Sequence, residues 1–121
     1  MSTPLERATL QAYKGLQAVL GIDVTISRGA ASTAISKAVP GRSQHDVTSN
    51  GQLVEQVQSR DFLIPVSAYK FNDVVSLPQR GDRITEDSTG KVYAILAMGS
   101  EAQWRYTDQT ELILRVHTKA M

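Results

Sequence analysis

Side chains that could perform acid–base or metal chemistry are few in this chain and lie far apart. The two histidines, His45 and His117, have no companions at the spacing of a metal-binding motif. His117 lies between Arg115 and Lys119, where like charge opposes the binding of a divalent cation. The chain has no cysteine, which excludes thiolate nucleophiles, thiolate metal ligands and disulfide bonds. We therefore predict no metal site and no cofactor.

Motifs of catalysis are absent as well. The sequence contains no nucleophile elbow, no P-loop, no dinucleotide-binding fingerprint and no HExxH zinc motif. Glu86 and Asp87 form an acidic pair, but an expected turn between strands gives them no separate environments that would set different pKa values. Arg80-Gly81-Asp82 matches the tripeptide of cell-adhesion ligands, yet a tight turn needs its glycine and aspartate for backbone reasons. The sequence predicts a protein without catalytic residues; a small enzyme with dispersed residues is the third alternative.

Length and charge narrow the class of protein further. A chain of 121 residues buries roughly two-thirds of its unfolded surface, which suffices for a single domain over residues 1–121. The balance of 13 basic and 12 acidic residues leaves a net charge of +1, too small for a long-range field that attracts nucleic acid. No apolar run approaches the roughly 18 residues of a membrane span, and no signal peptide is recognisable, so we expect synthesis in the cytoplasm.

Residues 1–21 are predicted to form an N-terminal helix. Ser2 or Thr3 can cap it, and Pro4 suits the first helical position. Apolar residues recur at helical spacing and are expected to form one stripe against the core: Leu5, Ala8, Thr9, Ala12, Leu16, Val19 and Leu20. Leu10 projects from the opposite face, where it is either a stray exposed leucine or a subunit contact.

Residues 22–121 change to the alternating pattern of β-strands. Strands are expected at 22–27, 32–39, 53–66, 83–85, 91–96, 103–107 and 111–119. The fold class is therefore predicted as mainly β with an N-terminal α-helix, in a small antiparallel β-barrel or sandwich of about six or seven strands. The apolar positions change parity between Leu53 and Phe62, which predicts a β-bulge near Ser59-Arg60.

A polar segment interrupts the strands between Pro40 and Gly51, where the chain reads PGRSQHDVTSNG. We expect a long irregular loop over residues 40–52, and a loop of this length in a compact domain is functional or mobile. Its candidate contacts to other subunits or partners, together with Leu10, are Arg42, Gln44, His45, Asp46 and Asn50.

The expected last strand has one apolar face and one basic face. Arg115, His117 and Lys119 share the basic face. They are candidates for lining a DNA conduit, or they form the solvated face of an edge strand. Trp104 and Tyr106 share one face of the preceding strand and are expected in the core, so they give little support to the runner-up, an OB-like nucleic-acid-binding β-barrel.

The order of these elements resembles the tail attachment protein of lambda-like phages, a member of the phage head–tail joining or neck stopper family. The resemblance covers nearly the whole chain in element order. It is carried by the N-terminal helix, Val24-Thr25-Ile26-Ser27, the polar segment, Phe62-Leu63-Ile64, Arg80-Gly81-Asp82-Arg83-Ile84, the Tyr93 strand and the ending from Leu112 to Lys119.

The resemblance implies a small β-barrel-like domain preceded by a helix, without catalytic residues. It further implies a structural role in the virion neck, after synthesis in the cytoplasm of the bacterial host. The expected partners are other copies of the chain in a ring of six or twelve, a portal or adaptor ring on the head side, and a tail terminator or tail tube protein on the tail side. Phage DNA is expected to pass through this ring.

Overall fold

The computed structural model describes the backbone of residues 3–49, 51–96 and 102–121, and the side chains of these residues except 45–49 and 53–57. Helix α1 (Pro4–Leu20) precedes a chain of strands and one short 3-10 helix. The elements that follow are β1 (Ile22–Arg28), β2 (Ala31–Ser49), β3 (Gln52–Pro65), η1 (Val66–Ala68), β4 (Lys70–Phe71), β5 (Val74–Val75), β6 (Arg83–Glu86), β7 (Val92–Ile95), β8 (Trp104–Tyr106) and β9 (Ile113–Ala120).

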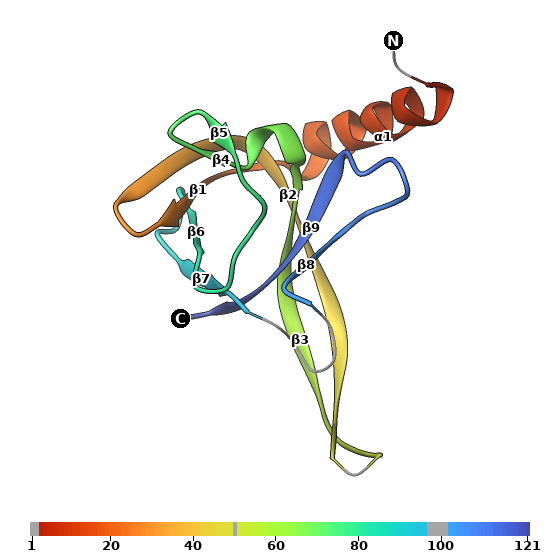
Figure 1. Ribbon diagram of the computed structural model, residues 1–121, viewed down its shortest axis with the longest axis vertical. Helices are drawn as coiled ribbons and strands as arrows, with labels where there is room; N and C mark the ends of the chain where they lie inside the picture. Colours follow the sequence, from red (N-terminus) through yellow and green to blue (C-terminus); the bar gives the residue numbers. More distant parts are fainter. Residues whose placement is uncertain (1–2, 50, 97–101) are drawn as a thin grey trace.

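Six of the described strands close into an antiparallel barrel in the order β3-β2-β1-β6-β7-β9 (Figure 1). Pairing of β3 with β9 completes the closure, from Arg60 opposite Thr118 to Pro65 opposite Ile113. Strand β8 is an extra strand on β9, beside the half of β9 that β7 leaves unpaired. The predicted fold class, mainly β with an N-terminal helix, is confirmed, and the structure selects the barrel over the sandwich.

The barrel core follows from the alternation of the strands. Alternate residues of β1, β3, β6, β7 and β9 point inward and are buried, because side chains one residue apart lie on opposite faces. The core comprises Val24, Ile26, Ile35, Ala38, Phe62, Ile64, Tyr69, Phe71, Ile84, Tyr93, Ile95, Leu114 and Val116. Trp104 and Tyr106 were expected in the core; both are partly buried and pack against it, with ring centroids 5.1 Å apart.

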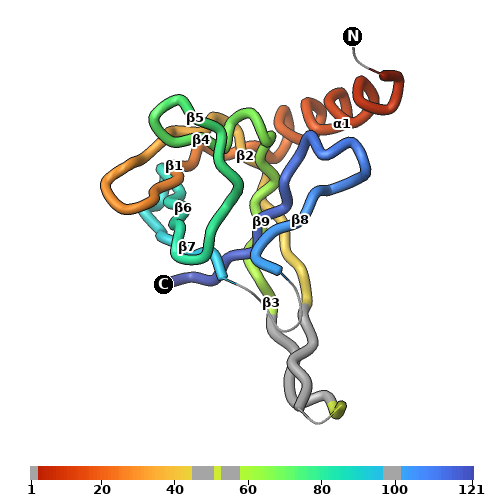
Figure 2. The backbone as a smooth tube through the Cα atoms, viewed as in Figure 1, coloured from red at the N-terminus to blue at the C-terminus, as the bar shows by residue number. Residues whose placement is uncertain are grey.

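The expected irregular loop over residues 40–52 is wrong, because this segment forms the outer part of a long β-hairpin. Strands β2 and β3 stay paired from Val39 opposite Leu63 to Ser49 opposite Gln52, and the hairpin projects beyond the barrel (Figure 1). The root of the hairpin leaves the barrel beside β9, with which β3 also pairs (Figure 2). Gly51 adopts a positive φ of 76° in the connecting turn. A two-stranded ribbon that leaves the barrel has no core to face, so its polarity does not indicate irregular backbone.

The β-bulge predicted near Ser59-Arg60 is also wrong. The register of β2 with β3 is continuous there, with Ser59 opposite Ser43, and it shifts between Val47 and Thr48 instead. The apolar residues before Ser59 belong to the projecting hairpin, so their parity is not set by the barrel core. A second irregularity lies between β1 and β2 beside Lys37, whose φ is 56°.

Candidate functional site

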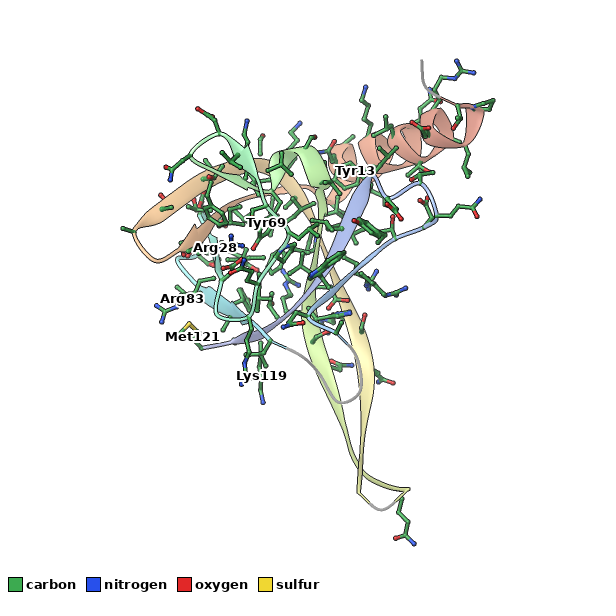
Figure 3. All side chains as sticks on the ribbon, in the orientation of Figure 1. Tyr13, Arg28, Tyr69, Arg83, Lys119 and Met121 are labelled. Atoms are coloured by element: carbon green, nitrogen blue, oxygen red, sulfur yellow. The ribbon has the colours of Figure 1, made fainter. Side chains whose placement is uncertain are left out.

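Helix α1 is fixed to the barrel chiefly by a residue that the sequence analysis did not single out. Tyr13 is 5% exposed, packs with Val39 and Ile113, and donates a hydrogen bond from its hydroxyl to the carbonyl oxygen of Leu63 at 2.8 Å (Figure 3). Burial raises the pKa of Tyr13 to about 12, against the lowering effect of a hydrogen bond with Gln17. A tyrosine inside an amphipathic helix, with both an apolar ring and a polar end, is the only signal that could have indicated this anchor.

The predicted burial of the apolar stripe of α1 is wrong. We call Leu5, Ala8, Ala12, Leu16, Val19 and Leu20 the helix stripe. All of its members are exposed, and Val19 reaches 82%. The helix contacts the barrel through Tyr13, and no member of the helix stripe belongs to a core cluster of the described residues. Part of it, with Tyr13, Leu63 and Ile113, lines a mainly apolar groove of ≈340 Å³ between α1 and the barrel.

A second exposed apolar surface lies on another side of the molecule. Val74 and Val75 of β5 are 65% and 51% exposed, and Leu77 follows them at 42%; we call these three residues the β5 patch. In Figure 1, β5 lies at the upper left of the barrel, whereas α1 extends to the upper right. Contiguous exposed apolar surface on a small protein is typical of contact sites.

Leu10 lies where the sequence placed it, on the face of α1 opposite the helix stripe. It is 37% exposed and lines a shallow depression with Arg7, Gln11 and Lys14. None of these four residues belongs to a core cluster of the described residues. Leu10 is therefore available as a candidate contact, separate from the helix stripe.

A buried polar cluster lies where the projecting hairpin joins the barrel. Asp61 is fully buried and accepts hydrogen bonds from Ser43, Ser59 and Nε of Arg115, the last at 2.7 Å. Nδ1 of His117 lies 2.9 Å from Oδ1 of Asp61. Burial opposes ionisation of Asp61, but the hydrogen bonds from His117, Ser43 and Ser59 together outweigh it and hold the pKa of this carboxyl well below its usual range.

This cluster corrects the expected solvated row on the last strand. Strand β9 is not an edge strand, since β3 pairs with it on one side and β7 and β8 on the other. His117 is buried and Arg115 is half-buried against Asp61, so only Lys119 of the three has an exposed side chain. Arg115 and His117 therefore bind Asp61 at the root of the hairpin. Lys119 remains a candidate for facing DNA.

The candidate contacts of the polar segment fall on the hairpin. Arg42 and Gln44 are exposed on β2 near its root. His45 and Asp46 lie further along β2, with side chains outside the described residues, and Asn50 lies outside them altogether. The structure thus places the backbone of the four described positions on one projecting element, and two of them lie beside the barrel end.

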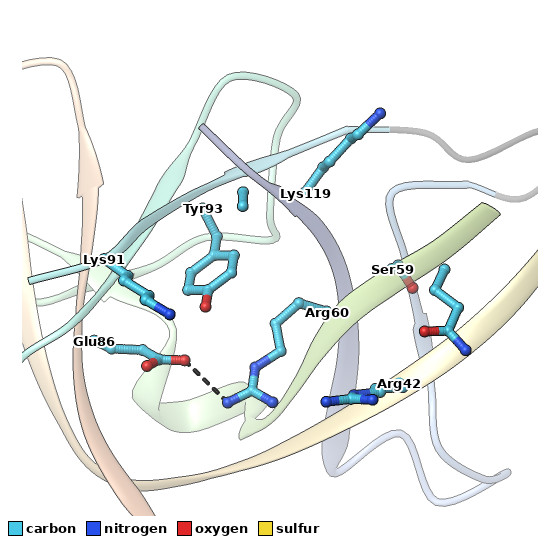
Figure 4. A pocket seen from close by; sticks show the side chains of 9 residues that line it. Arg42, Ser59, Arg60, Glu86, Lys91, Tyr93 and Lys119 are labelled. Atoms are coloured by element: carbon cyan, nitrogen blue, oxygen red, sulfur yellow. Dashed lines mark hydrogen bonds and ion pairs between the residues drawn. The ribbon is translucent and has the colours of Figure 1, made fainter. Parts of the chain in front are cut away.

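Basic side chains surround a cavity at this end of the barrel (Figure 4). The basic cavity has a volume of ≈440 Å³, and its charged lining residues are Arg42, Arg60, Lys91, Lys119 and Glu86. Arg60 binds Glu86 with 3.0 Å between Nη2 and Oε1, and its guanidinium lies 5.7 Å from the ring centroid of Phe62. The lining residues come from β2, β3, β6, β7, β9 and the turn after β6, so no local sequence pattern indicates the site.

The Arg80-Gly81-Asp82 tripeptide is part of the architecture. Asp82 is buried and accepts two hydrogen bonds from Arg28 at 2.8 Å, one from the Tyr69 hydroxyl and one from the backbone N–H of Gln79. Burial opposes the ionised form, but these hydrogen bonds lower the pKa of Asp82. The aspartate is therefore inaccessible to an adhesion receptor, and the turn interpretation is confirmed.

Within the described ranges, no three histidine, aspartate or glutamate side chains gather as a metal site would require. None of the helices in the same ranges is long and apolar enough to cross a membrane.

A family model described as phage head-tail joining protein matches residues 5–121, which is nearly the whole chain. The match extends from α1 through the hairpin to the end of β9. No curated protein matches the chain.

Proposed function

The chain belongs to the phage head–tail joining protein family, a family of structural components of the virion neck, and we propose that it acts there as one subunit of a closed homo-oligomeric ring of six or twelve copies. The ring joins a portal or adaptor ring on the head side to a tail terminator or tail tube protein on the tail side, and phage DNA passes through it.

The observation that carries the ring is the pair of exposed apolar surfaces on different sides of one subunit. A contact between two different patches of identical subunits is heterologous, and such contacts close into rings when the rotation between neighbours permits. We assign the helix stripe of one subunit to the β5 patch of the next. Full burial of a valine or leucine side chain contributes about 1.5–3 kcal/mol, so a few such residues give substantial contact energy.

The projecting hairpin and Leu10 are assigned to contacts other than the ring contact. The hairpin leaves the barrel away from α1 and β5 (Figure 1), so in this arrangement it extends toward the ring axis with Arg42, Gln44, His45 and Asp46 on it. We keep Asn50, which lies outside the described residues, as a further candidate contact. Leu10 lies on the free side of α1. We assign Leu10 to the adjoining ring of the neck.

Single charges introduced on α1 test these assignments. Val19→Asp should prevent ring closure, because it would bury an unpaired carboxylate in the subunit contact. Leu10→Asp should permit the ring but weaken its attachment, and Ala18→Asp, at an exposed position of α1 outside both surfaces, is the matched control. The readouts are thermal unfolding of the isolated subunit, incorporation into virions, and head–tail joining in a phage that lacks the wild-type gene. Normal joining by Val19→Asp, or absence of the wild-type protein from purified virions, would contradict the proposal.

A further inference from the structure

The basic cavity contains a like-charge arrangement that the protein itself does not neutralise. Arg42 and Arg60 are direct cross-strand partners on β2 and β3, and like charges opposite each other destabilise a strand pair. Glu86 compensates Arg60. Among the described residues, Arg42, Lys91 and Lys119 form no ion pair with an acidic side chain. Four of the 13 basic residues of the chain line this cavity, and Glu86 is the one acidic residue among its described lining residues.

The geometry of the cavity suits an anion with several acceptor oxygens. Arg60 lies on the same strand face as Phe62 and Ile64, so the cavity continues the barrel interior outward. The Tyr93 hydroxyl and the guanidinium groups of Arg42 and Arg60 face one opening (Figure 4). Guanidinium groups present forked N–H donors that match phosphate oxygens, and such charge-assisted hydrogen bonds are stronger than neutral ones.

We propose that the basic cavity binds a phosphate group of the DNA backbone as DNA passes the neck. The assignment to DNA rests on the proposed ring, in which the hairpin extends toward the axis and the cavity at its root faces the lumen. A DNA strand brings successive phosphates, whereas an acidic side chain of a neighbouring subunit brings one carboxylate. Three cations without a carboxylate partner therefore favour DNA as the occupant. One such site per subunit holds DNA weakly and without sequence preference, since phosphate contacts carry no base information.

Fluorescence anisotropy with a short labelled DNA duplex tests the site on the purified protein. The variant Arg42→Gln/Lys91→Gln removes two cations of the cavity that have no ion pair, so the Arg60–Glu86 bridge remains. The control Arg83→Gln/Arg105→Gln removes the same charge from two exposed positions elsewhere. We expect at least about a tenfold loss of affinity in the cavity variant, as for one charge-assisted hydrogen bond. The slope of log K against log[salt] should decrease in magnitude by about 1–2. The control should bind like the wild-type protein.

Further measurements distinguish a phosphate group of DNA from free inorganic phosphate as the bound anion. Inorganic phosphate, followed by amide chemical shifts, should perturb residues around the cavity weakly and should be displaced by the duplex. Equal losses in the cavity variant and the control would mean diffuse attraction and overturn the proposal. Phosphate binding that the duplex does not displace would also overturn it, because the site would then take the free ion.

Loss of ring assembly in the cavity variant, without any DNA binding by the wild-type protein, would assign the cavity to a carboxylate of the neighbouring subunit. If the double variant does not give the wild-type circular dichroism spectrum, Lys119→Gln alone is measured against Arg83→Gln, with the same expected order of affinities. A wild-type protein that assembles and joins heads to tails while its cavity variant binds DNA normally would refute the phosphate site and leave the ring intact.

Discussion

Replacing Asp61 should destabilise the protein more than any other single carboxylate change among the described residues. Asp61 is fully buried and is shared by Ser43, Ser59, Arg115 and His117. Asp61→Ala leaves a half-buried guanidinium and two buried partners without their common acceptor. Removal of one partner of a buried ion pair lowers the free energy of unfolding by about 3–5 kcal/mol. Because the Arg115 side chain is 22% exposed, we expect a decrease near the lower end of that range. Asp61→Asn retains one acceptor oxygen and should cost about 1.5–3 kcal/mol.

The pH dependence of this effect has a definite sign. The folded-state pKa of Asp61 is depressed, whereas an aspartate in the unfolded chain titrates near pH 3.9. Around and below that pH the unfolded state binds a proton that the folded state does not, so the stability contributed by Asp61 declines as the pH falls. The contribution is fully present above about pH 5. The stability difference between wild-type protein and Asp61→Asn should therefore be constant from about pH 5 to 7 and shrink below about pH 4.

Urea unfolding followed by circular dichroism at a series of pH values measures both quantities. Asp73→Asn is the matched control, because Asp73 is exposed and its positive φ of 64° suits asparagine. A loss below about 1 kcal/mol for Asp61→Ala would refute the reasoning, since it would equal the cost of one ordinary hydrogen bond. A difference between wild-type protein and Asp61→Asn that stays unchanged down to pH 3 would refute the assigned ionisation.

Two further changes test the attachment of α1 and the independence of the hairpin. Tyr13→Phe removes the hydrogen bond to the Leu63 carbonyl. Urea unfolding should therefore show a free energy of unfolding that is about 0.5–1.5 kcal/mol lower, and amide exchange in α1 should accelerate. Unchanged exchange would mean that the ring alone holds the helix. Replacing residues 45–57 by an Asn-Gly turn keeps Ser43, Ser59 and the barrel core, so the melting temperature should change little while head–tail joining is lost; unfolding of this variant would make the hairpin structural.

The fold was predictable where burial in the barrel core determines the alternation of apolar and polar residues along the strands. Val24 and Ile26 alternate because one face of β1 is buried, and Pro4 and Thr3 mark the start of α1 because the cap and first-turn rules are local. The hairpin and the helix stripe were mispredicted for one common reason. Apolar periodicity and polarity indicate whether a face of an element favours burial. They do not indicate whether the same chain or another copy buries that face. The polar hairpin can remain exposed to solvent, whereas the apolar helix stripe is not buried within one subunit.

The candidate sites were less predictable because each depends on strand register. Ser43, Ser59, Asp61 and Arg115 look like solvated polar residues in the sequence, and only the alignment of β2, β3 and β9 brings them together. The basic cavity has the same origin, since Arg42 and Arg60 become neighbours through a register that the sequence does not specify. The turn signals around Asp82, in contrast, were local and were interpreted correctly.

The distribution of these features over the molecule gives the proposed ring a direction. The helix stripe and the β5 patch lie at the end of the barrel opposite to the hairpin (Figure 1), while the basic cavity and the buried Asp61 cluster lie at the root of the hairpin. A stiff anchor at that root keeps the hairpin in one direction relative to the barrel. In the proposed ring, the same subunit therefore holds its neighbours through apolar contacts at one end and presents arginines to a passing phosphate at the other.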